Sequence, residues 1–405
     1  MSDFIKYNQT FFADPRRAQS LADRFHARFA TVPLRFFSAP GRAEIGGNHT
    51  DHQRGRVLAA AIDLDVLCAA SPNDLGLIRL DSMGYHVVST DDLAPRSDEK
   101  NTTPALIRGI AARFAELGYR VSGFDACLSS NVLVGSGLSS SAAFEVAVAT
   151  MINHLFNDGQ IPPGVIARIC QYAENTYFGK PSGLMDQMTS ATGGLVMIDF
   201  KDPERPEIER VDFDFAHSAH ALCVTGPLGS HSDLTDAYSA ITSEMRVIAS
   251  YFGEAVLREV DPDAFYAALP QLRGKVPDRA ILRAAHFFSE HSRVLSQARA
   301  LREGNFNEFL RLTDESGRSS FQYLQNVCHG DDMILALALS ASERILGGSG
   351  ACRVHGGGFA GTILAFVPLA ILDIYVNEMN RLFGSGSCHT LDVRGLGACE
   401  VEVRL

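Results

Sequence analysis

Apolar and polar positions alternate along this chain in two different rhythms, which predicts a mixture of helices and strands. Near the start, Leu21, Phe25 and Phe29 recur every four residues after the helix-start pair Asp14-Pro15. We expect this stretch to be an amphipathic helix. Short apolar runs between turn residues predict strands over residues 34–37, 57–62, 77–80, 85–88, 124–133 and 194–200. Further helices are expected over residues 103–118, 142–152 and 165–177.

The second half opens with a charged, proline-rich segment, residues 201–207, which we interpret as the start of a domain crossover. Helical spacing then dominates from about residue 232 to 342, with a long helix around residues 280–302. The remaining pattern is mixed. It predicts a strand running into residues 354–361, a strand over 362–367, a helix ending at 383 and two short strands.

Length and composition narrow the classes of protein to consider. With 405 residues, 46% of them apolar and 20% charged, the chain is expected to form two globular domains with a cleft between them. A net charge of −11 argues against nucleic acid as a partner. The sequence also lacks an apolar run of about eighteen residues and a start that resembles a signal peptide, so no membrane association is expected.

The cysteines indicate a reducing compartment. There are eight of them, scattered singly and without C-x-x-C spacing. This usage favours buried thiols over a disulfide framework or a zinc site. We therefore expect a cytoplasmic protein, and a monomer whose partners are small molecules.

The most informative stretch is the glycine- and serine-rich segment over residues 134–145. It follows a predicted strand and opens a predicted helix. Gly135 and Gly137 would let the backbone approach a ligand closely, and the serines stand where the N-cap and first turn of the helix belong. The backbone N–H groups at a helix N-terminus attract anions, above all phosphate. An ordinary glycine turn with a serine cap is the structural alternative.

Two familiar phosphate-binding motifs do not fit this segment. A Walker loop ends in Gly-Lys-Ser/Thr, and no lysine is present here. A dinucleotide-binding fingerprint needs a third glycine where Ser140 stands, and an acidic residue about twenty positions later. The segment therefore predicts a phosphate loop in which hydroxyl groups replace the lysine.

A second polar segment, residues 41–52, lies between two predicted strands and contains Arg42, His49, Asp51 and His52. Such a segment is expected to be a loop that faces a ligand. The two histidines and the aspartate are alternatively read as metal ligands, but a third well-spaced ligand is missing.

Together these segments resemble the galactokinase family of GHMP small-molecule kinases. Residues 41–51 are similar to its first signature, 134–144 to its ATP loop and 354–361 to its glycine-rich third motif. Residues 173–174 and 183–187 resemble its catalytic segment, and residues 283–293 a helical stretch of its second domain. The likeness extends over nearly the whole chain.

The resemblance implies a two-domain fold and a reaction. The fold would be α/β plus α+β, with a ribosomal-protein-S5-like N-terminal domain over residues 1–210 and a ferredoxin-like C-terminal domain over 211–405. ATP and sugar would meet in the cleft, with Mg²⁺ accompanying the nucleotide. The reaction would be transfer of a phosphoryl group from ATP to the anomeric (C1) hydroxyl of a galactose-type sugar.

The resemblance also assigns residues to roles. Asp186 would accept the proton of the sugar O1, and Arg42 would keep that carboxylate ionised and steady the phosphoryl group. A plain ion pair between loops is the structural alternative. The implied magnesium ligands are Ser141 and Glu174. The implied sugar ligands are Asn48, His49, Asp51, Gly183, Asp186 and Tyr238. The nucleotide would lie on Gly135, Ser136, Gly137, Leu138, Ser139, Ser140, Ser141 and Ala142, with Gly356, Gly357 and Gly358 bracing that loop.

Several positions depart from the family pattern. Glutamate is usual where Asn48 stands, asparagine where Glu44 stands and tyrosine where His52 stands. Lys180 adds an unexpected cation before the catalytic segment. Two alternatives to galactose phosphorylation therefore stay open. One is a sibling kinase for galacturonate, arabinose or an N-acetylhexosamine, and the other is a non-catalytic sugar sensor.

Overall fold

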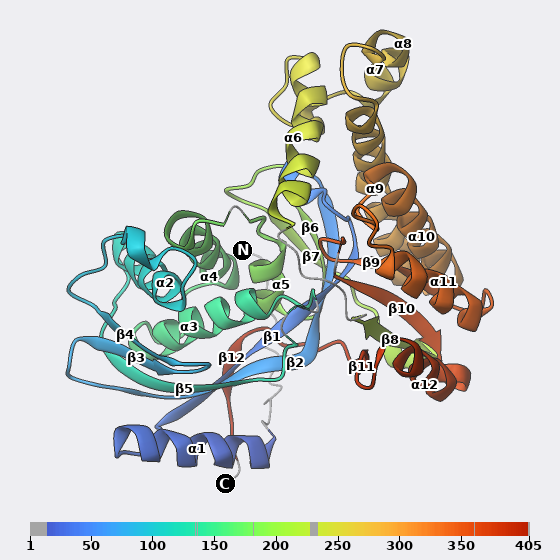
Figure 1. Ribbon diagram of the computed structural model, residues 1–405. Coiled ribbons are helices and arrows are strands. Elements are labelled where there is room, and N and C mark those ends of the chain that lie inside the picture. Colours follow the sequence, from blue (N-terminus) through green and yellow to red (C-terminus); the bar gives the residue numbers. More distant parts are fainter. Residues whose placement is uncertain are drawn as a thin grey trace.

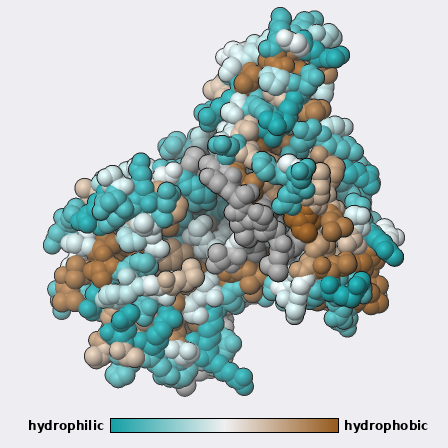
Figure 2. Space-filling model, in the orientation of Figure 1, coloured by the Kyte–Doolittle hydropathy of each residue, from teal (hydrophilic) through white to brown (hydrophobic). Residues whose placement is uncertain are grey.

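The computed structural model describes residues 14–133, 135, 137–180, 182–226, 234–359 and 361–403. Two sheets form two lobes, and a helical projection rises above them (Figure 1). On the face shown in Figure 2, hydrophilic residues predominate, and groups of hydrophobic residues lie among them on both lobes. None of the described helices combines the length and apolar character that a membrane span requires.

The first lobe is built on an eight-stranded sheet with the order β12-β1-β2-β5-β3-β4, extended by β6 beside β2 and β7 beside β6. All described pairings are antiparallel except that of β3 with β5. The strands are β1 (Arg35–Gly46), β2 (Arg56–Pro72), β3 (Leu77–Asp81), β4 (Tyr85–Ser89), β5 (Phe124–Ser130), β6 (Leu195–Asp199), β7 (Glu207–Arg210) and β12 (Cys399–Val401).

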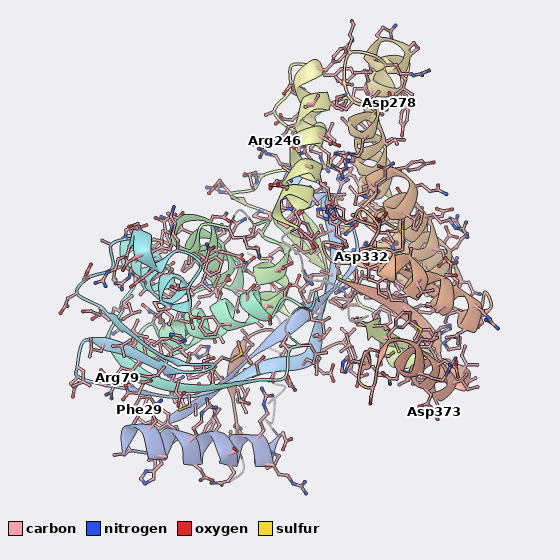
Figure 3. The ribbon with its side chains drawn as sticks, viewed as in Figure 1. Phe29, Arg79, Arg246, Asp278, Asp332 and Asp373 are labelled. Atoms are coloured by element: carbon pink, nitrogen blue, oxygen red, sulfur yellow. The ribbon has the colours of Figure 1, made fainter. Side chains whose placement is uncertain are left out.

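Helices cover both faces of this sheet. On one face, α1 (Pro15–Phe29) packs Leu21 and Phe25 onto Leu67 and Cys127, as its apolar stripe predicts. A cation–π contact holds its last turn, since the Arg79 guanidinium lies 5.1 Å from the centre of the Phe29 ring (Figure 3). The other face carries α2 (Thr103–Glu116), α3 (Ser140–Phe156), α4 (Pro163–Tyr172), the π-helical turn η3 (Ala173–Phe178) and α5 (Met185–Thr192) (Figure 1).

The second lobe contains a four-stranded antiparallel sheet in the order β11-β8-β10-β9. Along β10, Ile363 and Ala365 face one hydrophobic cluster while Leu364 and Phe366 face another, as the two-residue period of a strand requires. The strands are β8 (His220–Thr225), β9 (Ala351–His355), β10 (Thr362–Pro368) and β11 (Cys388–Leu391), and their helices are α10 (Phe306–Ser319), α11 (Ile334–Leu346) and α12 (Leu372–Phe383).

The helical projection has a hydrophobic cluster of its own, formed by residues such as Ile241, Phe265 and Phe287. It comprises α6 (Thr235–Tyr251), α7 (Pro262–Ala267), α8 (Leu269–Leu272) and α9 (Asp278–Arg302) (Figure 1). The remaining turns are η1 (Asp51–Gln53), η2 (Ser97–Glu99), η4 (Phe215–Ser218), η5 (Leu257–Glu259), η6 (Ser320–Leu324) and η7 (Leu369–Ile371). Because α9 also contacts β1 and β2, it joins the projection to the first sheet.

The predicted domain boundary at residue 210 stays a prediction, but one segment departs from it. β12 lies in the first sheet beside β1, with Val401 opposite Phe36, although the prediction assigned residues 211–405 to the second domain. Val401 and Phe36 share a hydrophobic cluster with α1, and Arg35 Nε donates to Glu400 Oε1 over 2.6 Å. These contacts hold β12 in the first sheet. The strand is so short that its sequence does not indicate which sheet it joins.

Two further expectations need correction. Residues 41–46 were expected in a loop, yet they continue β1, because the polar side chains of Arg42 and Glu44 find buried partners. The helix expected over residues 165–177 ends as α4 at Tyr172 and continues as the π-helical turn η3, which carries Glu174.

Candidate active site

Arg42 and Asp186 meet at the centre of the first lobe. Arg42 is buried on β1, and Asp186 is in the first turn of α5. The Arg42 Nε donates to Asp186 Oδ1 over 2.7 Å, and its Nη1 donates to the Gly137 carbonyl. The Arg42 backbone N–H donates to the Leu138 carbonyl over 3.1 Å. The guanidinium therefore joins the carboxylate to the glycine- and serine-rich loop.

The surroundings keep Asp186 ionised. Burial alone would raise its pKa, but the charge and hydrogen bond of Arg42 outweigh burial and hold the pKa below the usual value. The Ser139 hydroxyl donates to the other oxygen, Oδ2, and acts in the same direction. At neutral pH this carboxylate can thus accept a proton from a bound hydroxyl group.

The loop before α3 has the backbone that its glycines suggest. Gly135 and Gly137 have φ of 77° and 70°, and Ser139 is the N-cap at a left-handed φ of 58°. The Ser139 side chain does not cap the helix, since its hydroxyl is used by Asp186. The Ser141 side chain is exposed, and Leu138 and Ala142 anchor the loop in the core. Ser136 lies outside the described residues.

The glycine-rich segment after β9 braces this loop. A β-carbon at Gly137 would lie 3.1 Å from both His355 Nδ1 and Thr362 Oγ1, so side chains of the second sheet fill the space beside it. A β-carbon at Gly356 would lie 3.7 Å from the Gly137 carbonyl. The contact that the sequence suggested for this segment is therefore present, and it holds the loop from the opposite lobe.

Asn48 lies inside a network of protein hydrogen bonds, which gives no support to its prediction as a sugar ligand. The residue is fully buried, and its Nδ2 donates to Glu44 Oε1 over 2.8 Å and to the Gly356 carbonyl over 2.7 Å. Its Oδ1 accepts from Ser320 Oγ and Asn326 Nδ2. Both donors and both acceptor positions of the amide are thus occupied by protein groups.

Glu44, which accepts a hydrogen bond from Asn48, belongs to a buried ion pair. Arg353 Nη2 donates to Glu44 Oε1 over 2.7 Å, and both side chains are inaccessible to solvent. Burial outweighs the opposing charge of Arg353 and raises the pKa of Glu44 to about 6. This network includes the Asn48 amide. It holds the polar segment of residues 41–52 against the second sheet.

Close contacts join the other predicted sugar ligands to neighbouring segments, and their role stays a prediction. A β-carbon at Gly183 would overlap the Asp51 carboxylate, so the segment before Asp186 packs directly on Asp51. His49 has a left-handed φ of 56°, and its Nε2 lies 3.1 Å from the Gly357 carbonyl. The Tyr238 hydroxyl donates to the Gly358 carbonyl over 3.0 Å. His49 and Tyr238 thus both lie on the segment after β9.

His49 is a neutral hydrogen-bonding group rather than a cation. Burial, together with the neighbouring charge of His52, lowers the pKa of His49 to about 4. Its ring stacks on that of His52 at 6.0 Å between centres. The alternative reading of His49, Asp51 and His52 as metal ligands finds no support, since no group of three or more His, Cys, Asp or Glu side chains among the described residues could hold a metal ion.

Glu174 lies in a buried polar cluster with both oxygens engaged. Lys180 Nζ donates to Oε1 over 2.9 Å, and Gln187 Nε2 donates to Oε2 over 2.8 Å. Gln187 Nε2 also donates to Glu145 Oε2 over 3.0 Å. Burial, reinforced by the charge of Glu174, raises the pKa of Glu145 well above its usual value. The cluster connects η3, α5 and α3, with Glu145 one helical turn after Ser141.

Several residues of the recognised segments support the site through contacts that the sequence did not assign to them. His286 Nε2 lies 2.9 Å from the Asn48 carbonyl, and Glu290 accepts the Gly47 N–H over 3.0 Å. His355 Nε2 accepts the Glu44 N–H over 2.9 Å. The segments around His286 and His355 had been recognised by resemblance, but a sequence pattern does not reveal which backbone group a side chain will meet. Gln187 could have been found, because it directly follows Asp186.

Two family models match the chain. The model of the GHMP kinases N terminal domain matches residues 105–194, and the galactokinase galactose-binding signature matches residues 23–72. Among curated relatives, galactokinase of Streptomyces coelicolor is 31% identical over 375 residues, which cover 91% of this chain and 93% of that protein. Galactokinase of Homo sapiens is 29% identical over 401 residues, which cover 95% and 97%.

Solved structures agree with these matches at the level of the fold. The structure of Lactococcus lactis galactokinase complexed with galactose has a TM-score of 0.81 at 21% identity and is covered to 99%, with 95% of this chain covered. A mevalonate kinase structure has a TM-score of 0.64 at 13% identity, covering 89% of this chain and 99% of that one. The two-domain α/β plus α+β fold expected from the sequence is thereby confirmed. Given these matches over nearly its whole length, the chain belongs to the galactokinase family of GHMP kinases.

Proposed function

We propose that this protein transfers the γ-phosphoryl group of ATP to the C1 hydroxyl of galactose, giving galactose 1-phosphate and ADP. The observation that carries the proposal is the Arg42–Asp186 pair, in which one guanidinium touches both the carboxylate and the loop before α3. Phosphoryl transfer needs an acceptor hydroxyl and a phosphate held in line, with positive charge nearby. This arrangement supplies those requirements.

In the proposed reaction, Asp186 accepts the proton of O1 as that oxygen forms its bond to the γ-phosphorus. The bond from the γ-phosphorus to the bridging oxygen breaks, and ADP leaves with those electrons. Arg42 Nε orients the carboxylate while its positive charge faces the transferring group. The N–H groups in the first turn of α3 would receive the phosphates of ATP, with Gly135, Gly137 and Ser140 giving them access.

The sugar would lie between the segment at Asp51 and the segment after β9. The Asp51 carboxylate would accept hydrogen bonds from sugar hydroxyls, and so would Nδ1 of neutral His49, whose Nε2–H bonds the Gly357 carbonyl. The backbone of Gly183 packs beside Asp51. Tyr238, held by the Gly358 carbonyl, would contribute an aromatic edge. Asn48 acts through the shape of this segment and is not proposed as a direct ligand.

ATP is expected to bind as its magnesium complex. The exposed hydroxyl of Ser141 fits a magnesium ligand, since Mg²⁺ prefers oxygen donors and usually retains several waters. Glu174 does not fit in its present state, because its two oxygens hold Lys180 and Gln187. We therefore assign no step of the reaction to a metal bound by Glu174.

The alternative sugars lose their main support from the sequence. A galacturonate kinase is the alternative suggested by Asn48 in place of a carboxylate and by the added cation of Lys180. Asn48 is buried with its amide fully bonded to protein groups, so it offers no hydrogen bond to a C6 carboxylate. The sensor alternative is disfavoured by the intact contact of Arg42, Asp186 and the loop.

The proposal is tested by measuring ADP formation by the purified protein with D-galactose, galacturonate, arabinose and N-acetylgalactosamine. We expect galactose to have the highest kcat/KM, and ³¹P NMR to identify the product as an anomeric phosphate. Higher kcat/KM with galacturonate would overturn the choice of sugar. If the protein bound ATP but formed no ADP with any sugar, the enzymatic proposal would be overturned in favour of the non-catalytic sugar sensor.

Two further proposals concern the setting of the protein. We propose a cytoplasmic location, supported by the state of the eight cysteines, all of which are free thiols. We also propose that the chain acts as a monomer and that residue 210 marks the main crossover between its domains. Light scattering of the purified protein tests the oligomeric state.

A further inference from the structure

Lys180 forms an ion pair with a buried carboxylate of the candidate site. Its ammonium group is 2.9 Å from Oε1 of Glu174, the carboxylate that family resemblance assigns to magnesium. Glu174 is buried with a side-chain exposure of 5%, whereas 57% of the Lys180 side chain is exposed. The ammonium group therefore connects a buried carboxylate to solvent.

The backbone holds this lysine in place. Gly179 has a φ of 91°, which turns the chain sharply after η3. The N–H groups of Gly179 and Lys180 then both donate to the Glu174 carbonyl, over 2.9 and 3.1 Å. The side chain of Lys180 is thus brought back over the residue to which its own backbone is bonded. This turn fixes the backbone from which the Lys180 side chain reaches Glu174.

The rest of the cluster ties Lys180 to the phosphate loop. Glu174 Oε2 accepts from Gln187 Nε2, which also donates to Glu145 on α3. The positive charge of Lys180 also helps to lower the pKa of Asp186, although its effect is smaller than that of Arg42, which donates to this carboxylate over 2.7 Å.

We infer that Lys180 is a phosphate-binding residue that takes the place of a metal ion on Glu174 and contacts the terminal phosphates of ATP. The inference rests on the proposed function and names a further residue of the same site. A lysine ammonium has three N–H donors, and Glu174 uses one of them. The remaining donors are available to phosphate oxygens, for which lysine acts as a point charge.

Direct coordination of magnesium by Glu174 conflicts with this geometry. A magnesium ion binds its oxygen ligands at about 2.0–2.1 Å, which would bring it close to an ammonium on the same carboxylate oxygen. In a buried cluster, like charges repel more strongly than in water. The Glu174 carboxylate therefore holds Lys180, and the metal is left to the nucleotide phosphates and Ser141.

The test compares the wild type with Lys180→Met and Lys180→Arg by calorimetric titration with ATP in EDTA. We expect Lys180→Met to bind metal-free ATP at least about ten-fold more weakly, as the loss of a charge-assisted hydrogen bond implies. Lys180→Arg should retain most of the affinity. Lys100→Met, an exposed lysine beside Gly179, is the matched control and should bind like the wild type.

Unchanged metal-free ATP affinity in Lys180→Met would overturn the inference. Wild type that binds ATP with magnesium but not in EDTA would also overturn the inference. If the wild type bound ATP in neither condition, the proposed function would fail instead, so the two failures are distinct. Thermal unfolding of each variant reports whether the fold is intact.

A second measurement follows the metal by electron paramagnetic resonance of Mn²⁺ with ADP. We expect Glu174→Gln to leave Mn²⁺ affinity unchanged in the wild-type background, because Lys180 and not the metal holds this carboxylate. In the Lys180→Met background the carboxylate becomes available, so Mn²⁺ affinity should rise and Glu174→Gln should abolish the gain. A loss of Mn²⁺ affinity on Glu174→Gln alone would show direct coordination and overturn the inference.

Discussion

The Nε of Arg42 donates to Oδ1 of Asp186 over 2.7 Å, across a sequence separation of 144 residues. The same guanidinium donates to the Gly137 carbonyl, so one side chain fixes the distance between carboxylate and loop. Arg42 is buried, and moving its side chain away would leave the Asp186 carboxylate without its ion-pair partner. The relationship between proton acceptor and phosphate loop is thereby set before any ligand binds.

Replacing Asp186 by Asn should abolish most turnover and preserve binding. The amide keeps the shape of the carboxylate and an oxygen for Arg42, but it cannot take the O1 proton at neutral pH. We expect kcat to fall by about 10²–10⁴-fold, the range for loss of a general base. Calorimetry should give dissociation constants for ATP and galactose close to those of the wild type. Asp202→Asn, on an exposed turn, serves as the control, and near-normal turnover in Asp186→Asn would remove Asp186 from its role.

Replacing Arg42 by Gln should move the acidic limb of the pH–rate profile. Arg42 holds the pKa of Asp186 below its usual value, so the carboxylate is active at neutral pH and loses activity as pH falls through that pKa. Without the guanidinium, burial dominates and the pKa rises. The acidic limb of kcat should therefore shift to higher pH, in addition to a lower plateau. A profile that loses height without shifting would mean that Arg42 acts on the phosphate alone.

Gly137→Ala should weaken nucleotide binding with little effect on sugar binding. The new methyl group would lie 3.1 Å from His355 Nδ1 and Thr362 Oγ1, and the φ of 70° strains any residue other than glycine. Gly118→Ala is a matched control, with a φ of 80° and nothing within 4 Å of the new methyl. Both variants should lose about 1 kcal/mol of stability from the backbone alone. We expect calorimetry to find weaker ATP binding in Gly137→Ala only, and equal affinities would argue against a packed loop.

Restoring the usual family residue at position 48 should destabilise this protein. Asn48→Glu would place a second carboxylate beside Glu44, where the present amide donates over 2.8 Å. We expect the free energy of unfolding to fall by about 2–4 kcal/mol, as for a buried unpaired charge. The exchange variant Glu44→Asn/Asn48→Glu keeps one amide and one carboxylate and should recover part of that loss.

Urea denaturation measures both variants, and pH supplies a further check. The raised pKa of Glu44, about 6, means that its contribution to stability is present at low pH and is lost as pH rises through that value. A second carboxylate at position 48 should make that loss larger above pH 6. If Asn48→Glu alone were as stable as the wild type, this result would contradict the closed hydrogen-bond network around Asn48.

The contact between Arg42, Asp186 and the loop before α3 was largely predictable from the sequence, because each of the three belongs to a short motif with a physical signature. The glycines of the loop predicted its backbone, and the helix at residue 140 followed from apolar spacing. The surroundings of Asn48 were not predictable. Its partners Ser320 and Asn326 are 272 and 278 residues away and lie in a turn without a marked pattern. The π-helical turn at Glu174 was also missed, since helical periodicity does not distinguish it from an α-helix.

The position of β12 has a consequence for how the chain is made. Its residue Glu400 contacts Arg35 across 365 residues of sequence, so the edge of the first sheet stays unpaired during synthesis until the second lobe has emerged from the ribosome. An open strand edge is a site of aggregation, and a contact so distant in sequence forms slowly. The first lobe cannot complete its sheet without β12, a strand that the ribosome adds only after the second lobe.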